Sequence, residues 1–85
     1  MAVGVNQKAL KISPKDFELH NNLGNALRET GKLEEAEASY KKAIALKPNH
    51  AEAHYNLGNI LNDIGKLEAA VISYKKAISY KTNHF

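Results

Sequence analysis

Apolar side chains recur at intervals of three and four residues along most of the chain, which is the spacing of an amphipathic helix. Leu19, Leu23 and Leu27 share one face of a segment that is predicted to be helical from about Phe17 to Thr30. A second helix is predicted from Leu33 to Leu46. Its apolar face consists of Leu33, Ala36, Tyr40, Ala43 and Ile44. The pattern therefore predicts two short helices that each bury one side.

The same pattern occurs a second time. Residues 51–84 match residues 17–50 at 21 of 34 positions without a gap. The second copy therefore predicts two more helices, Ala51–Ile64 and Leu67–Tyr80. A fixed period of this length indicates a solenoid, in which each unit buries its apolar face against its neighbours.

Glycine and proline mark the ends of the predicted helices. Gly31 and Gly65 directly follow the first helix of each copy, and glycine readily adopts the left-handed conformation found at helix ends. Pro48 cannot extend the second helix. Asn49 and Glu52 are expected to form a capping box that begins the next helix.

Two further glycines, Gly24 and Gly58, fall inside the first helix of each copy. Glycine at such a position costs about 1 kcal/mol relative to alanine. We expect close approach of the partner helix, helped by the small Ala36 and Ala70, to offset this cost. Tyr40 and its copy are expected to fill core space between the two units.

These positions resemble the tetratricopeptide repeat, whose pattern is W-x2-L-G-x2-Y, then A-x3-F, then P. The first copy reads His20-x2-Leu23-Gly24-x2-Leu27, then Ala36-x3-Tyr40, then Ala43 and Pro48, and the second reads His54-x2-Leu57-Gly58-x2-Leu61, then Ala70-x3-Tyr74, then Ala77. His and Leu replace the two aromatic residues of the first helix, and Thr82 stands where a second proline is expected. The resemblance implies an all-α, right-handed solenoid of antiparallel helix pairs.

The resemblance also predicts how the chain is divided. Residues 17–50 and 51–84 are expected to be two repeats. Ala2, Lys8, Ala9 and Pro14 align more weakly with Ala36, Lys42, Ala43 and Pro48. Residues 1–16 are therefore expected to hold the second helix of a partial preceding repeat, over residues 2–12, and Phe85 to begin a missing unit.

Polar side chains form a stripe on each predicted first helix. The stripe of the first copy is Glu18, Asn22, Asn25 and Glu29, and that of the second is Glu52, Asn56, Asn59 and Asp63. In the tetratricopeptide architecture the first helices line the concave surface, so the resemblance places the two stripes side by side in a groove. Asn22 and Asn56 match the asparagine ladder in the repeat domain of protein O-linked N-acetylglucosamine transferases.

An asparagine amide carries both donors and an acceptor, so it can bridge the two polar groups of a peptide backbone. We therefore expect an extended peptide to bind in the groove. The expected contact residues are Asn22, Asn25, Arg28, Tyr55, Asn56 and Asn59. In chaperone-binding relatives, lysines and an arginine clamp a carboxylate of the ligand. Such a clamp is not expected here, because Asn21 and Tyr55 stand where the first clamp lysine and its copy would be.

The second copy is more apolar than the first. Ile60, Ile64, Val71, Ile72 and Tyr80 stand where the first copy has Ala26, Thr30, Glu37, Ala38 and Leu46. An apolar surface of this kind marks an interface or an aggregation liability. Two interpretations follow: the chain is a fragment of a longer array, or its exposed edge pairs with another copy. The two are compatible, since a truncated array would tend to self-associate. The residues expected to take part in self-association are Ile64, Val71, Ile72, Tyr80 and Phe85.

Composition narrows the chemistry. The chain has 85 residues, enough for one small domain, and a net charge of +3. Its lysines are spread along the sequence rather than clustered, which favours a solvated surface over a nucleic-acid interface. The absence of cysteine excludes disulfides and thiolate metal sites. His50 and His54 are four residues apart, as metal ligands can be, but nothing at a fixed spacing completes such a site.

These features together predict a non-catalytic protein-interaction module with a protein or peptide partner. No catalytic residues, metal, cofactor, nucleic acid or membrane partner is expected, and a homo-oligomer is possible. The alternative function is a structural self-assembly unit whose groove has no ligand. With no signal peptide and no apolar run of about 18 residues, a cytoplasmic location is expected.

Overall fold

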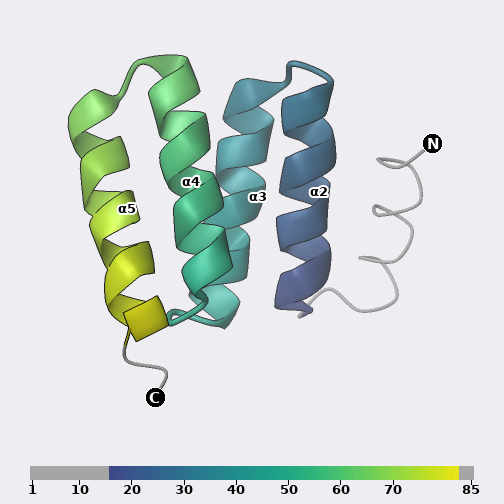
Figure 1. The fold of residues 1–85 in the computed structure, drawn as a ribbon. Helices are drawn as coiled ribbons and strands as arrows, with labels where there is room; N and C mark the ends of the chain where they lie inside the picture. The colour runs from purple at the N-terminus through teal and green to yellow at the C-terminus, as the bar shows by residue number, and fades with distance from the viewer. Residues whose placement is uncertain (1–15, 83–85) are drawn as a thin grey trace.

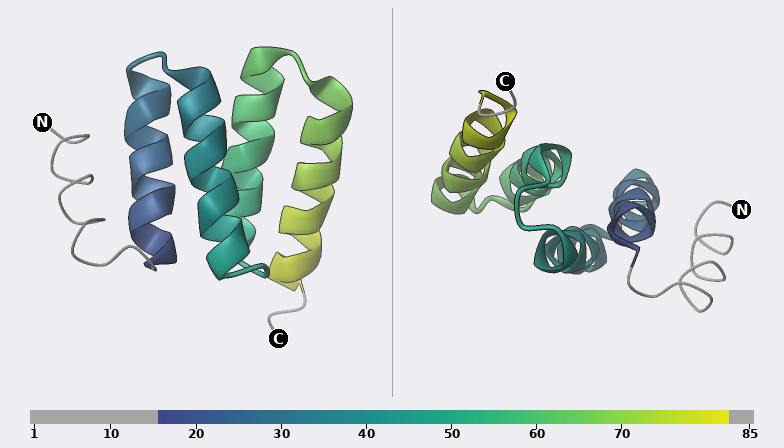
Figure 2. Two further views of the ribbon diagram at one scale, coloured as in Figure 1. Left: turned by 180° about the vertical axis from the view of Figure 1, so that it is seen from behind. Right: turned by 90° about the horizontal axis from the view of Figure 1, so that it is seen from below.

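The computed structural model describes residues 16–82, and the described part consists of helices and their connections (Figure 1). The helices are α2 (Phe17–Glu29), α3 (Leu33–Leu46), α4 (Ala51–Ile64) and α5 (Leu67–Thr82). Each helix packs against the next one in the chain, and α2 also contacts α4. The view along the helices shows α3 to one side of α2 and α4 (Figure 2). This arrangement confirms the predicted all-α helical solenoid.

The helix ends agree closely with the prediction. Helix α2 ends one residue before Thr30, and α5 continues two residues past Tyr80 to Thr82. Proline stops α3 near Pro48, whereas the threonine at the equivalent position of α5 still has an N–H and can continue a helix. The expected helix at residues 2–12 and the expected contact of Phe85 lie outside the described residues.

The glycines that follow α2 and α4 end these helices as expected from the sequence. Gly31 and Gly65 adopt φ values of 81° and 100°, the left-handed conformation that favours glycine. Asp16 caps α2, because its side chain accepts a hydrogen bond from the backbone N–H of Glu18 at 2.9 Å.

None of the helices of residues 16–82 has the length and apolarity that a membrane crossing requires.

The capping box predicted for α4 is wrong. The residue before the helix is His50 rather than Asn49, and its side chain makes no capping hydrogen bond. The cause is a tight turn, in which the backbone N–H of His50 donates to the carbonyl of Lys47 at 3.0 Å and leaves Asn49 inside the turn. A ring nitrogen of the buried His54 lies 2.8 Å from the carbonyl oxygen of Pro48.

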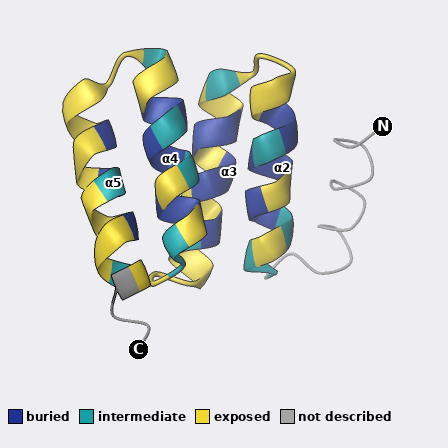
Figure 3. Cartoon of the chain, in the orientation of Figure 1, coloured by how far each residue is buried: buried dark blue, intermediate teal, exposed yellow. Residues whose placement is uncertain are grey.

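The core lies between α2, α3 and α4 and reaches one side of α5. Its buried members are Leu23, Leu27, Ala36, Tyr40, Leu57, Ile60, Leu61 and Ala70. Figure 3 shows buried residues on the facing sides of the inner helices, whereas α5 is exposed over most of its surface. Among residues 16–82, nothing therefore covers one side of α5 as α4 covers α3.

The mid-helix glycines make room for tyrosine rings. A Cβ added to Gly24 would lie 2.5 Å from the Cε1 atom of Tyr40, and one added to Gly58 would lie 2.7 Å from the Cε1 atom of Tyr74. The partner helix therefore approaches through its tyrosine ring, a more direct cause than the small alanines that we expected to allow the approach. Glycine is required at both positions because a side chain there would overlap the ring.

Candidate peptide-binding groove

Helices α2 and α4 lie side by side and are joined by two polar contacts. The Nδ2 atom of Asn56 donates to Oδ1 of Asn21 at 3.1 Å. Near the C-terminal ends of the same helices, Nε of Arg28 lies 2.8 Å from Oδ2 of Asp63. The first helices of the two units are thus held together near their middle and near their C-terminal ends.

Asn25 and Asn59 are fixed by the second helix of their own unit. The hydroxyl of Tyr40 donates to Oδ1 of Asn25 at 2.6 Å, and the hydroxyl of Tyr74 donates to Oδ1 of Asn59 at the same distance. Burial raises the pKa of Tyr40 to about 12, so its hydroxyl stays protonated and remains a donor at neutral pH. Within residues 16–82, the Nδ2 group of each asparagine makes no side-chain hydrogen bond.

Sequence reasoning missed this hydroxyl contact, because it treated Tyr40 and Tyr74 as core residues alone. The signal was present in the sequence. Phenylalanine fills this position in the family pattern, whereas both copies here carry tyrosine, and a buried tyrosine hydroxyl usually has a hydrogen-bond partner.

Asn22 and Asn56 differ in their surroundings although they are equivalent in the repeat. Asn22 is exposed, and its side chain makes no hydrogen bond within residues 16–82. Asn56 is half-buried and donates to Asn21, which leaves its Oδ1 as an acceptor. The buried Asn21 is a structural partner that the sequence reasoning did not find, because the contact joins residues 35 positions apart.

Arg28 lies near the C-terminal end of α2 and is already paired. Its side chain is 42% exposed, and its hydrogen bond to Asp63 raises the pKa of the guanidinium above its ordinary value. The carboxylate of Asp63 balances this charge, so Arg28 is not a free cation for an acidic ligand.

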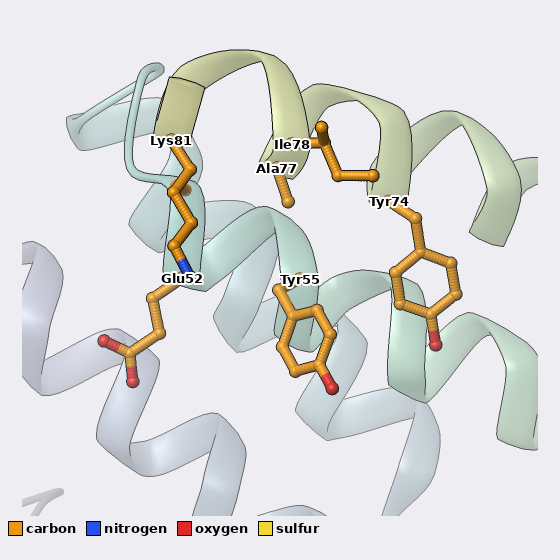
Figure 4. A pocket seen from close by; sticks show the side chains of 7 residues that line it. Glu52, Tyr55, Tyr74, Ala77, Ile78 and Lys81 are labelled. Carbon is orange, nitrogen blue, oxygen red and sulfur yellow. The ribbon is translucent and has the colours of Figure 1, made fainter. Parts of the chain in front are cut away.

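Tyr55 lies on the side of α4 that faces away from α2. Its first-unit equivalent, Asn21, is buried against α4, but Tyr55 is 54% exposed because no further helix of residues 16–82 covers it. Its ring centroid lies 5.8 Å from that of Tyr74. The two rings border an open hollow of about 720 Å³ whose floor includes Ala77 and Ile78 (Figure 4).

The predicted self-association residues within residues 16–82 differ in their exposure. Val71 and Ile72 are exposed on α5, but Ile64 packs against the core. Tyr80 is partly buried, with its ring centroid 5.3 Å from that of His54. The structure also exposes two large apolar side chains of α5 that sequence reasoning did not single out, Leu67 and Ile78.

A third polar contact connects the two units on the α3 side. The carboxylate of Glu37 lies 2.8 Å from Nζ of Lys41 and 3.5 Å from Nζ of Lys66. Its hydrogen bond to Lys41 is the largest cause that lowers the pKa of Glu37, and the charge of Lys66 adds to the effect. Lys66 belongs to the second unit, so this contact helps to fix how the units stack.

Comparison with known proteins agrees with this geometry. Models described as tetratricopeptide repeat match residues 5–38 and 51–84, and a model described as TPR repeat matches residues 24–63. A search of curated protein sequences found no match.

Several solved structures share the fold. "MamA MSR-1 C2" has a TM-score of 0.92 and 30% identity, over 99% of this chain and 48% of that chain. YrrB, described as "a TPR protein with an unusual peptide-binding site", has a TM-score of 0.90 and 29% identity, over 98% of this chain and 43% of that one. The first TPR of Spaghetti (RPAP3), bound to the HSP90 peptide SRMEEVD, has a TM-score of 0.91 and 24% identity, over 98% of this chain and 66% of that one.

The chain thus spans about half of the length of the MamA structure that it matches. The family models together reach from residue 5 to residue 84. The described helices α2 to α5 are, in order, the first and second helices of two successive units, as the repeat pattern requires. The chain belongs to the tetratricopeptide repeat family.

Proposed function

We propose that the chain is a non-catalytic interaction module that binds an extended peptide along the groove formed by α2 and α4. The observation that carries this proposal is the equivalent placement of Asn22 and Asn56 on neighbouring first helices, with Asn22 exposed and unbonded within residues 16–82. Packed helices lie about 8–10 Å apart, and an extended peptide advances about 3.3 Å per residue. Asn22 and Asn56 can therefore contact peptide residues that are about three positions apart.

The hydrogen-bonding groups left open along the groove suit a peptide backbone. Asn25 and Asn59 keep their Nδ2 donors, since their Oδ1 atoms accept from tyrosine. Asn56 keeps its Oδ1 acceptor, since its Nδ2 donates to Asn21. A peptide offers carbonyl acceptors and N–H donors in alternation, so both kinds of group find a partner whatever the ligand's side chains are.

The charges on this surface favour a neutral or basic ligand. Glu18, Glu29 and Glu52 are exposed on the stripes and make no ion pair within residues 16–82. Arg28 is neutralised by Asp63. An acidic peptide would therefore meet like charge along the groove, whereas lysine or arginine side chains would be attracted to its rim.

Two resemblances support this proposal. YrrB is described as a TPR protein with an unusual peptide-binding site, and it is 29% identical to this chain. The asparagine positions also resemble the ladder of the O-linked N-acetylglucosamine transferases. The first resemblance supports peptide binding by a chain of this fold, and the second supports a role for the asparagines of the first helices.

A binding experiment on the whole chain tests the proposal. Peptides of about ten residues, which extend over about 33 Å, are selected by display against the chain. Their dissociation constants are then measured by fluorescence anisotropy. We expect the double variant Asn22→Ala/Asn56→Ala to bind about 10- to 100-fold more weakly, since it loses two hydrogen bonds of about 0.5–1.5 kcal/mol each.

The matched control is Asn49→Ala, because Asn49 is an exposed asparagine outside the first helices. It is expected to bind like the unaltered chain. Circular dichroism checks that the double variant is folded, since Asn56 also bonds to Asn21. Failure to select any peptide, or unchanged affinity in the folded double variant, would show that the groove is not the binding site.

The alternative function, self-assembly, has its own structural support. It would use the exposed apolar side chains of α5, among them Val71 and Ile78, rather than the asparagines. The two activities involve different faces and are compatible in one molecule.

A further inference from the structure

One side of α5 carries a straight stripe of large side chains. Leu67, Val71 and Ile78 are 59%, 50% and 63% exposed. With Tyr74 and Lys81 they are spaced four, three, four and three residues apart. This is the spacing of the contact seam of a coiled coil, so these side chains lie in line along one side of the helix.

In the first unit, the side of α3 that is equivalent to this stripe is covered by a helix. The equivalent residues of α3 include Leu33, Tyr40 and Ile44, which are covered by α4. Leu33 and Ile44 pack against the core, and Tyr40 is only 1% exposed. The same side of α5 therefore has the shape of a helix-binding site, but the described residues supply no helix to cover it.

A helix like α4 does not match the polar features of this site. Three polar contacts hold α4 and the residues after it on the first unit, through Asn21, Arg28 and Glu37. The equivalent positions of the second unit are Tyr55, Asn62 and Val71. The charged groups are gone and an apolar side chain has replaced Glu37, so the surface favours an apolar partner over a copy of α4.

The two halves of the stripe differ in shape. The C-terminal half of α5 borders the hollow of about 720 Å³, which lies between Tyr55, Tyr74, Ala77 and Ile78. Figure 4 shows the two tyrosine rings toward one end of this hollow and Lys81 with Glu52 at the other. The N-terminal half instead carries exposed side chains, Leu67 and Val71. One molecule thus has both a hollow and the apolar groups to fill one.

We propose that this face of α5 binds a second copy of the chain, with the two α5 helices antiparallel about a two-fold axis. In an antiparallel pair of identical helices, the residue numbers of facing residues have a constant sum. The register that places Leu67 against the partner's Ile78 therefore also places Val71 against the partner's Tyr74. The two-fold axis repeats both contacts, so each copy fills the hollow of the other. This interface does not depend on the peptide groove.

The test is sedimentation equilibrium of the full chain from about 1 to 200 μM, since dimers of modest size dissociate in the micromolar range. We expect a reversible dimer. Leu67→Glu and Ile78→Lys are each expected to raise the dimer dissociation constant at least tenfold, because each places a charge in the apolar seam.

The matched control is Ile72→Glu. Ile72 is 57% exposed on the same helix but lies about 100° around it from Val71, so this variant is expected to dimerise normally. Far-UV circular dichroism verifies that every variant is helical.

Mixing the two disrupted variants tests the register. In a mixed dimer, Glu at position 67 of one copy meets Lys at position 78 of the other, and the second contact keeps its native residues. The mixture is therefore expected to recover dimer that neither variant forms alone. A chain that is monomeric at every concentration, a mass that grows beyond the dimer, disruption by Ile72→Glu, or a mixture that stays monomeric would each overturn the proposal.

Discussion

Single tyrosines link the packing of this protein to its groove. The ring of Tyr40 lies where Gly24 has no side chain, and its hydroxyl holds the amide of Asn25. The same three positions recur in the second unit. One residue therefore fills the core and also orients a hydrogen-bonding group on the candidate binding surface, so changes in packing there will reach the groove.

Substitution of Gly24 by alanine tests this packing. Alanine favours a helix over glycine by about 1 kcal/mol, so propensity alone predicts a gain in stability. We expect instead a loss of about 1–3 kcal/mol in the free energy of unfolding, because the new Cβ overlaps the ring of Tyr40 and the core must shift. Urea denaturation measures the change.

The control variant is Gly24→Ala combined with Tyr40→Leu, which removes the ring that the methyl group would meet. The penalty for alanine should shrink when it is measured against Tyr40→Leu alone. A single Gly24→Ala variant more stable than the unaltered chain would contradict this account.

At the scale of whole helices, local sequence signals predicted the elements well. The ends of α2, α3 and α4 follow from residues within one turn of them, such as Gly31, Pro48 and Gly65. The capping of α4 was mispredicted, because the turn before it is closed by a backbone bond to Lys47 rather than by the side chain of Asn49.

The contacts between helices could not be predicted in the same way. The bond between Asn21 and Asn56 joins residues 35 positions apart, and it depends on the stacking of two units rather than on any local period. Tyr80 was expected on an exposed interface, but its ring packs beside His54, the residue that stands where the family pattern has tryptophan. The smaller histidine leaves room that only the packed structure reveals.

Glu37 connects α3 to the segment that precedes α5, and its ionisation makes this connection dependent on pH. The bound lysines lower the pKa of Glu37. The stabilisation that this carboxylate contributes is therefore complete above the pKa that Glu37 has in the unfolded chain. It is lost as the pH falls through the lower pKa that Glu37 has in the folded chain.

We expect Glu37→Gln to lower the free energy of unfolding by about 1 kcal/mol at pH 7, and this difference to vanish well below about pH 4. Thermal unfolding across this pH range provides the measurement. Glu34→Gln is the control, since Glu34 is exposed on the same helix and makes no ion pair within residues 16–82. An equal effect at low and neutral pH would rule out the proposed role of the charge.

At the scale of the molecule, the inter-unit contacts fix the spacing of the two polar stripes. Arg28 with Asp63 and Asn21 with Asn56 hold α2 beside α4. The separation between the two stripes is thereby set by the fold. A surface that is preformed in this way loses less conformational entropy when a ligand binds to it.

The most direct test of the groove is an NMR titration that follows the side-chain amide resonances of the asparagines. A peptide selected on the unaltered chain is expected to shift the amides of Asn22 and Asn56 most, to move those of Asn25 and Asn59 less because tyrosine already holds them, and to leave Asn49 unchanged. Shifts confined to α5 or to the loops, with Asn22 and Asn56 unmoved at saturation, would contradict the account.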